Sequence, residues 1–370
     1  MTDRFAAARR REALAVVDLD AVASNFRLLA RLSGKAECAA IVKGDGYGLG
    51  LMEEARAAAL AGARQFFVAR FEDGRRLRQA HPGAKIAVLD GLCGWARAEF
   101  AAAELVPVLS TAPDTRAWLT GASAGPFMLH IDTGMNRLGL KPAELPAITE
   151  LLRANAKAMV CYLTHFASAD DVDLGLCRDQ VGRFESALAG LPKAPCSICN
   201  SSGLFLDVPE WRADMTRPGK ALAGINPMPA GEPNPVAQAM TVTAPIVQVS
   251  EVARGDSIGY SATFRASRPM RIVTLSIGYS NGYLRALSNR GVVAFNGRRA
   301  PLVGRVSMDL VTADATAVPD ADLAAGYAEM LGPTIGLTEL ATLAGTNEYE
   351  MQISLGRGCK RVHIGKAAGA

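Results

Sequence analysis

Short apolar runs alternate with amphipathic segments of helical period over the first two thirds of the chain. The apolar runs have the length and composition of buried strands, and helical crossovers separate several of them. The predicted strands are Cys38–Lys43, Phe66–Arg70, Lys85–Asp90, Leu105–Ser110, Phe127–Asp132, Met159–Phe166, Ser197–Ser201 and Met215–Leu222. The predicted helices include Leu51–Ala61, Glu72–Ala80, Pro142–Lys157 and Asp173–Leu188. This α/β pattern predicts a (β/α)8 barrel of the TIM type, with an open doubly wound sheet as the structural alternative.

The pattern changes near Pro235, where strands begin to follow one another with turn residues between them. The predicted strands are Met240–Val249, Met270–Ile277, Gly291–Phe295, Pro301–Val306 and Leu310–Ala315. We therefore expect a barrel domain over residues 16–235 and a C-terminal all-β domain over residues 240–370. The early apolar run Ala15–Asp20 is out of phase with the barrel count, so the segment 1–20 is a candidate to pair with the β-domain instead.

Composition and charge are those of a globular enzyme. The 370 residues are 49% hydrophobic and 21% charged, enough to bury a large core in two domains. The net charge of +4 is dispersed, which favours a small anionic ligand over nucleic acid. No apolar stretch is long enough to span a membrane. The segment Met1–Ala15 lacks the apolar region of a secretory signal, so we expect a solvated helical tail, with a transit peptide as the weaker alternative.

The cysteine pattern predicts a reducing compartment, the cytoplasm. The chain has seven cysteines, an odd number, and they are scattered through apolar segments. Cys196 and Cys199 form a CxxC pair, but there is no second pair and no nearby histidine. We therefore expect small core residues and no metal site.

Lys43 is the leading candidate for chemistry. It ends an apolar run and opens into a loop with glycine at positions 44, 46, 48 and 50. Partial desolvation lowers the pKa of a lysine and makes its amine nucleophilic, while glycine-rich backbone donates N–H groups to an anion. The pattern predicts a Schiff-base lysine beside a phosphate site, against the alternative of a solvated lysine. A dinucleotide fingerprint fails because Leu49 stands where the third glycine belongs, and no P-loop lysine follows.

Polar residues follow several of the predicted strands, at the end where a barrel collects its site. They are Lys43, Tyr47, His130, Arg137, His165, Asn200, Ser201, Arg217 and Gly219. Each of these residues could instead have a purely structural role. A lone histidine on a strand is usually a core residue, and Asn-Ser-Ser-Gly is usually a turn or a helix cap. An arginine such as Arg137 often forms a surface ion pair. Their common position favours one active site.

Eight motifs in order, spanning Val16 to Arg361, give the chain a close resemblance to a known family. They are AAIVKGDGYGLG, HIDTGMNRLGL, THFASADD, CNSSG, DMTRPGKAL, SIGYSATF, SIGYSNGY and VGRVSMDLVTAD. The chain resembles the bacterial alanine racemases, fold-type III enzymes that depend on pyridoxal 5'-phosphate (PLP) and combine a barrel with a C-terminal β-domain. The resemblance implies racemisation of L- and D-alanine, supplying D-alanine for peptidoglycan.

The resemblance also implies a role for each motif residue. Lys43 would hold PLP and act as base on one face of the substrate, and Tyr260 of a neighbouring subunit would act on the opposite face. Arg217 would face the pyridine nitrogen, and His165 would orient that arginine. Tyr47, Ser201 and the Gly219 backbone would bind the cofactor phosphate, with Asn200 and Arg357 beside them. Arg137 would bind the substrate carboxylate. Met308 and Asp309 would form the edge of the substrate pocket, and Tyr279 would lie at its entrance. An obligate homodimer follows from the shared site.

Several positions depart from the family pattern. Gly44 and Gly46 replace alanines and Asp45 replaces asparagine, which we expect to weaken PLP affinity. His130 stands where some members carry a carbamylated lysine, so another anion or a direct contact must position Arg137. Further departures are Leu49 for histidine, Lys220 and Ala223 for typically apolar and aromatic residues, and Asn281 for aspartate.

Three alternatives to alanine racemisation stay open on the sequence. Ala223 could widen the pocket for serine or larger substrates, which would give a racemase of broader specificity. A non-catalytic PLP-binding protein shares the barrel but ends after it, so the β-domain and Tyr260 count against this alternative. A PLP decarboxylase of the same architecture lacks support, because the His-Gly-Ser type motifs expected of it are not apparent.

Overall fold

The computed structural model describes residues 12–121 and 125–369. Most of the expected N-terminal tail, Met1–Ala15, lies outside the described residues. The described chain divides into two compact units. The barrel unit comprises residues 21–46 and 51–237, and the β unit comprises residues 12–20, 47–50 and 238–369. None of the helices in the described ranges has the length and hydropathy needed to cross a membrane.

The barrel unit is built on a closed ring of parallel strands. In chain order these are β2 (Glu37–Cys38), β3 (Ala40–Ile41), β4 (Gln65–Val68), β5 (Lys85–Val88), β6 (Val106–Leu109), β7 (Phe127–His130), β8 (Met159–Leu163), β9 (Cys196–Ser197) and β10 (Met215–Thr216). The sheet runs β2-β10-β9-β8-β7-β6-β5-β4-β3. β2 and β3 are halves of one strand, and because β2 pairs with β10 while β3 pairs with β4, the ring closes. The predicted (β/α)8 barrel is confirmed, and the open sheet is excluded.

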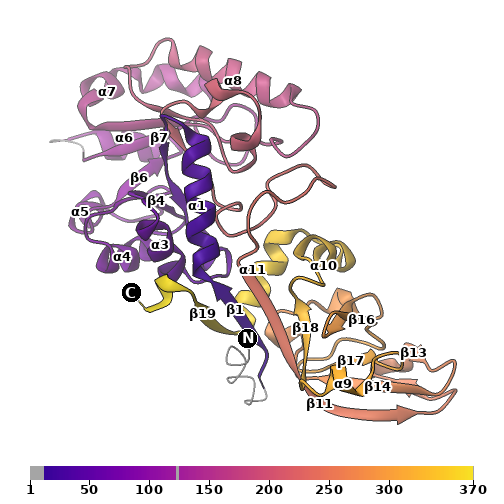
Figure 1. Ribbon diagram of the computed structural model, residues 1–370. Coiled ribbons are helices and arrows are strands. Elements are labelled where there is room, and N and C mark those ends of the chain that lie inside the picture. The colour runs from indigo at the N-terminus through magenta and orange to yellow at the C-terminus, as the bar shows by residue number, and fades with distance from the viewer. Residues whose placement is uncertain (1–11, 122–124, 370) are drawn as a thin grey trace. The chain divides into compact units, whose positions relative to one another are not determined.

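Helices follow most of the barrel strands (Figure 1). They are α3 (Leu51–Leu60), α4 (Phe71–Ala80), α5 (Arg97–Ala102), α6 (Ala112–Leu119), α7 (Thr149–Ala154) and α8 (Gly175–Leu188), with the 3-10 turn η2 (Pro142–Ala147) before α7. A further helix, α1 (Leu19–Ser33), precedes the first barrel strand. Most of the strands end earlier than the apolar pattern predicts. β8 stops at Leu163, and the pattern continues to Phe166 because that ring is buried against Trp211, with ring centroids 5.3 Å apart. Polar site residues therefore lie in the loops after the strands.

The β unit is mostly antiparallel sheet. Its strands are β1 (Leu14–Asp18), β11 (Met240–Val252), β12 (Ser257–Ile258), β13 (Phe264–Arg265), β14 (Met270–Leu275), β15 (Val292–Phe295), β16 (Arg298–Pro301), β17 (Val311–Asp314), β18 (Tyr327–Leu331) and β19 (Lys360–Ile364). The main sheet runs β16-β15-β18-β11-β1-β19, and β14 pairs with β11 and β17. β1 lies antiparallel to β11 and parallel to β19, so the start of the described chain joins strands from its end.

The β unit also contains helices that the strand pattern does not predict. They are α9 (Asp320–Leu323), α10 (Leu337–Ala344) and α11 (Glu348–Gly358). The predicted strand Pro301–Val306 is wrong over most of its length, because β16 ends at Pro301. Leu302 forms an isolated β-bridge with Ala313, and Val303 and Val306 are buried in the loop that follows. Burial without a continuous strand therefore accounts for the apolar pattern.

Gly282 is expected to be a stability-critical glycine of the β unit. Its φ is +78°, and an added Cβ would lie 2.0 Å from the Ser354 carbonyl oxygen of α11. Gly297 has a similar φ of +83°, but its Cβ would meet no atom within 4 Å. We expect Gly297→Ala to lower the unfolding free energy by about 1 kcal/mol through backbone strain, and Gly282→Ala by roughly 3 kcal/mol or more because overpacking adds to strain. Urea unfolding measures both, and equal losses would contradict the packing argument.

Candidate active site

Lys43 lies in a loop of unusual backbone geometry, two residues after β3 ends. The segment α2 (Lys43–Tyr47) contains three consecutive left-handed residues, Gly44, Asp45 and Gly46, with φ of 69°, 59° and 63°. Glycine adopts this conformation without steric cost. Asp45 accepts a hydrogen bond from the Leu51 N–H at 3.0 Å, so the loop folds back onto the start of α3 and fixes the backbone that carries Lys43.

The electrostatic environment of Lys43 is that of a reactive amine. Burial lowers its pKa most, and the positive charges of Arg137 and Arg217 lower it further, while Asp90 opposes them. Lys43 is only half-buried, so the amine is both partly desolvated and accessible. This combination increases the fraction of neutral, nucleophilic amine at neutral pH. The alternative of an ordinary solvated strand-end lysine does not fit the environment.

Arg217 is a buried cation held by acceptors at the strand ends. Its Nε donates to the Ser197 hydroxyl at 2.8 Å, and its Nη2 donates to the carbonyl oxygens of Thr164 and Ile198. Burial lowers its pKa to about 10, with the Cys161 and Cys199 thiols acting in the opposite direction. The guanidinium therefore stays protonated at neutral pH in a fixed orientation.

The two histidines of this region are neutral. Burial, followed by the charge of Arg217, lowers the pKa of His165 well below its usual value and that of His130 to about 4. Arg217 Nη1 and His165 Nδ1 are 3.5 Å apart, so a neutral imidazole accepts from the guanidinium when its proton is on Nε2. His165 thus lies where it can orient Arg217 without adding charge.

Ser201 lies between two backbone amides of the loop after β10. Its hydroxyl oxygen accepts from the Gly219 N–H at 2.9 Å and from the Ala221 N–H at 3.2 Å, which leaves the hydroxyl proton for donation to an anion. Asn200 accepts from the Gly203 N–H at 3.0 Å and so caps the turn that follows. The structure brings Ser201 and Gly219 together as predicted, and it gives Asn200 a structural contact in addition to any ligand.

The remaining candidate residues lie in the β unit. Tyr260 is 70% exposed. It lies in a turn in which the next two residues, Ser261 and Ala262, have positive φ. Tyr279, Met308 and Arg357 are exposed as well. Tyr279 and Ser280 pair with the Ser307–Asp309 segment, and the Ser280 hydroxyl donates to Asp309 at 2.7 Å. Tyr47 is buried in this unit, with its ring centroid 6.2 Å from that of Tyr349. The predicted site residues therefore come from both units.

Comparison with known proteins places the chain in a family. Residues 17–227 match the family described as "Alanine racemase, N-terminal domain", and residues 239–363 match "Alanine racemase, C-terminal domain". The chain belongs to the alanine racemase family. It is 39% identical over 367 residues to the alanine racemase of Rhizobium meliloti (strain 1021), covering 95% of this chain and 96% of that protein. It is 41% identical over 354 residues to the alanine racemase of Acidiphilium cryptum (strain JF-5), covering 94% and 97%.

A solved structure of the alanine racemase family agrees in fold over nearly the whole chain. It is the crystal structure of alanine racemase from Bartonella henselae with covalently bound pyridoxal phosphate, with a TM-score of 0.89 and 34% sequence identity. The match covers 95% of this chain and 99% of that structure.

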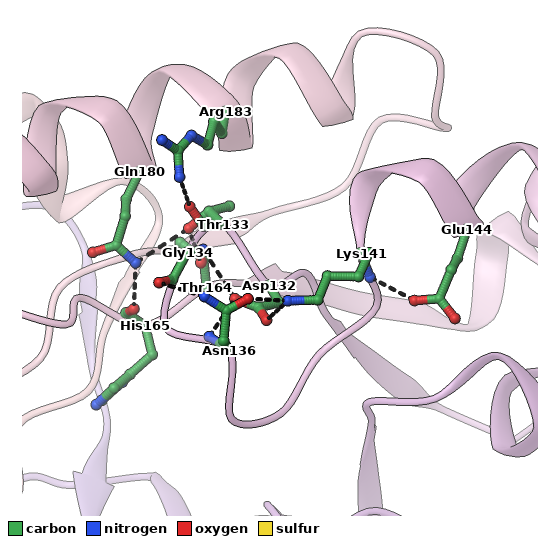
Figure 2. Close-up of polar contacts among 10 residues, drawn as sticks. All are labelled: Asp132, Thr133, Gly134, Asn136, Lys141, Glu144, Thr164, His165, Gln180 and Arg183. Carbon is green, nitrogen blue, oxygen red and sulfur yellow. Dashed lines mark hydrogen bonds and ion pairs between the residues drawn. The ribbon is translucent and has the colours of Figure 1, made fainter.

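Sequence patterns alone missed the residues that hold the site of this alanine racemase family member together. Lys141 contacts Asp132 and Asn136 beside the predicted substrate residue Arg137, and Gln180 of α8 links Thr133 to the His165 carbonyl oxygen (Figure 2). Lys220, noted only as a departure from the family, is 7% exposed and pairs with Asp170 at 2.8 Å. The Gln180 and Lys220 contacts join segments that are far apart in the sequence, whereas Lys141 closes a single loop.

Glu54 is a buried carboxyl group beside the Lys43 loop. It lies on α3 with no exposed surface, and neither carboxyl oxygen has a hydrogen-bond partner among the described residues. A Cβ added at Gly46 would lie 2.8 Å from Glu54 Oε2, so this carboxyl group and a glycine share one space. Burial, followed by the charge of Asp45, raises the pKa of Glu54 well above its usual value. The folded protein therefore favours the protonated form of Glu54 far more than the unfolded chain does.

The protonation of Glu54 predicts a pH-dependent penalty on stability. The unfolded chain releases this proton near pH 4, at the ordinary glutamate pKa of about 4.3, whereas the folded protein keeps it. Folding thus requires proton uptake at higher pH, and the penalty grows until the pH reaches the raised folded pKa. Glu54→Gln is neutral at every pH, so we expect its melting temperature to exceed that of the parent by a margin that widens as the pH rises above the ordinary glutamate pKa. Glu53→Gln, at the more exposed neighbouring position, is the control; a margin for Glu54→Gln that does not vary with pH would contradict the assignment.

Proposed function

We propose that the chain is a PLP-dependent isomerase that interconverts L- and D-alanine with two proton-transferring residues, Lys43 and Tyr260. The observation that carries the proposal is the half-buried Lys43 amine, whose pKa is lowered by burial and by Arg137 and Arg217. The family membership supports alanine as the substrate, because the named relatives are alanine racemases. The solved relative from Bartonella henselae supports PLP as the cofactor.

The barrel residues fit a doubly anionic cofactor. Lys43, Arg137 and Arg217 put three cationic groups near one another, which an anionic ligand would neutralise. Ser201, with its hydroxyl proton available, and the Gly219 backbone would bind the phosphate, together with Tyr47, Asn200 and Arg357. When bound, PLP supplies an electron-withdrawing ring that stabilises negative charge at the substrate Cα.

Arg217 would interact with the pyridine nitrogen as a donor that retains its proton. The guanidinium pKa of about 10 keeps it charged at neutral pH, and the carbonyl oxygens and the Ser197 hydroxyl fix its plane. Neutral His165 holds one guanidinium nitrogen from the side. A donor that does not give up its proton limits electron withdrawal by the ring, which disfavours side reactions such as transamination.

Racemisation needs proton-transferring groups on both faces of Cα, and Lys43 is proposed for one of them. We assign the other to Tyr260 of a second copy of the chain, so that the enzyme is a homodimer with shared sites. The 70% exposure of Tyr260 in the single chain supports this assignment, because an aromatic side chain so exposed is available to a partner. Met308, Asp309 and Tyr279, on neighbouring segments of the β unit, would line the same shared pocket.

Arg137 is proposed to bind the substrate carboxylate, because it brings a positive charge close to Lys43. In the cell, we propose that the enzyme acts in the cytoplasm and supplies D-alanine for peptidoglycan. In this division of roles, the barrel domain over residues 16–235 holds the cofactor and the domain over residues 240–370 contributes Tyr260 to the partner. Nothing in the described residues favours serine over alanine, and Ala223 is fully buried.

Removing the Lys43 amine tests the proposed cofactor linkage. We expect the purified protein to bind PLP with a visible absorbance band and to form D-alanine from L-alanine. Lys43→Ala should lose that band and reduce the rate by more than about a thousandfold, because the nucleophile and one base are both removed. Absorbance spectra and a D-alanine assay measure both effects. Lys157→Ala is the control. Lys157 is an exposed lysine just before β8, at the end of the strand away from the proposed site, so this variant should behave as the parent. An unchanged spectrum for Lys43→Ala would contradict the linkage.

Mixing inactive variants tests whether the site is shared between two chains. We expect Tyr260→Phe to keep the PLP band and to lose at least about a hundredfold in rate, within the range for general acid–base catalysis. If subunits of Lys43→Ala and Tyr260→Phe exchange at random, half the dimers are hybrids with one intact site each, so activity should recover to about a quarter of the parent. Each variant refolded alone is the control. No recovery in demonstrated hybrids would exclude Tyr260 acting across the interface.

A further inference from the structure

The proposed substrate residue Arg137 lies at the end of a tight turn after β7. Burial is the main cause of the lowered pKa values of Lys43, His130 and His165, and the positive charge of Arg137 contributes to each of them. Arg137 itself is exposed. Its position therefore depends on the turn that carries it, residues 132–136.

Asp132 organises this turn from the inside. Its side chain is 2% exposed, and Oδ1 accepts from the N–H groups of Gly134 at 2.9 Å and Asn136 at 3.1 Å. Asn136 has a φ of +55°, the left-handed conformation that asparagine tolerates. Two backbone hydrogen bonds close the base of the loop: the Asp132 N–H donates to the Leu140 carbonyl oxygen, and the Leu140 N–H donates to the His130 carbonyl oxygen. The chain between them is thus a closed loop that presents Arg137.

Lys141 connects the two ends of the turn. Its ammonium donates to Asp132 Oδ2 at 2.6 Å and to the Asn136 side-chain oxygen (Figure 2). The Lys141 backbone N–H donates to Glu144 at 2.7 Å, which anchors the residue at the start of η2. One cation therefore satisfies the second oxygen of a buried carboxylate and also holds the residue that immediately precedes Arg137.

The other end of the turn is held from α8 and β8. The Thr133 hydroxyl is 2.7 Å from that of Thr164 and 3.3 Å from Gln180 Nε2, and the Thr133 carbonyl oxygen accepts from Arg183 at 3.0 Å. Figure 2 shows these contacts on one side of the turn and Lys141 on the other. Because Lys141 holds the end next to Arg137, it is the contact that bears most directly on the guanidinium.

We propose that Lys141 is a positioning residue for Arg137 and thereby sets the affinity of the site for the substrate carboxylate. The proposal rests on the proposed function, in which Arg137 binds that carboxylate. Without the ammonium, Asp132 keeps a buried charge with one oxygen uncompensated, and the Asn136 side-chain oxygen loses its contact with Lys141. The turn then loosens beside Arg137, whereas Lys43, Arg217 and the Ser201 loop keep their own contacts. Substrate binding should weaken more than turnover.

The competing interpretation is an ordinary surface ion pair. Lys141 is 48% exposed, and pairs of that kind contribute little to stability. Such a pair would leave substrate affinity unchanged when it is removed. The partner Asp132 is nearly fully buried, however, and the same ammonium contacts a second residue of the turn, which an isolated surface pair does not do.

The test compares Lys141→Met with Lys141→Arg in the PLP-loaded protein. Lys141→Met keeps the aliphatic stem and removes the charge, so we expect KM for L-alanine to rise about tenfold while kcat changes less than about threefold, as for lost ground-state binding. Lys141→Arg restores a cation and should bring KM back to within about threefold of the parent. Lys157→Met, an exposed lysine outside this loop, is the matched control and should not change KM. The PLP absorbance band should be the same in all four proteins. Lys141→Met should melt at a lower temperature than the other three, because Asp132 keeps an uncompensated buried charge, so KM is measured at a temperature at which all four are folded.

A second measurement does not depend on turnover. Propionate carries the carboxylate and carbon chain of alanine without the amine, and its dissociation constant can be measured by calorimetry. We expect Lys141→Met to weaken propionate binding about tenfold and to speed amide exchange of Gly134 and Asn136, and Lys141→Arg to reverse both effects. Unchanged KM and propionate affinity in Lys141→Met, or an Lys141→Arg protein no better than Lys141→Met, would overturn the proposal. Absence of D-alanine formation by the parent would instead refute the proposed function, and the propionate arm would still decide the role of Lys141.

Discussion

The burial of one guanidinium constrains the rest of the barrel site. Arg217 is almost completely removed from solvent, and a buried cation is tolerated only when acceptors surround it. The acceptors are a hydroxyl of β9 and carbonyl oxygens that follow β8 and β9. Those groups come together only because parallel strands end at the same side of a closed barrel. The fold and the electrostatics of the site therefore depend on each other.

Burial and the charge of Arg217 together influence the ionisation of the neighbouring groups. Burial is the main cause of the lowered pKa values of His165, His130 and Lys43, and the charge of Arg217 lowers each of them further. A neutral His165 can accept from the guanidinium, and a lysine with a lowered pKa can attack a carbonyl carbon. An anionic cofactor would relieve the repulsion among these cations. The same arrangement thus provides both the reactivity of the amine and the attraction for a ligand of opposite charge.

The loops around this cation are held by polar contacts between segments distant in sequence. Gln180 lies on α8 with no exposed surface, and its amide contacts Thr133, the His165 carbonyl oxygen and the Ala167 N–H. It therefore links the loop after β7 to the loop after β8. Lys141 instead makes a local contact, which holds the β7 loop closed on itself. A site assembled from loops needs such contacts because catalytic groups must hold their geometry to a fraction of an ångström.

The sequence by itself was sufficient to predict the barrel, a mostly β second unit and the position of Lys43 just after a barrel strand. Strand and helix periodicity is local, and a glycine-rich loop after an apolar run is visible without a structure. The sequence was not sufficient to predict where β8 ends or the helices α10 and α11. It indicated that the first segment could join the β-domain, but not that β1 would lie between β11 and β19. Only tertiary structure decided that Glu54 is buried without a partner, that Lys141 reaches Asp132 and that Lys220 reaches Asp170. The physical reason is that burial and charge pairing depend on which segments meet in space, and a local pattern of apolar and polar residues does not encode those meetings.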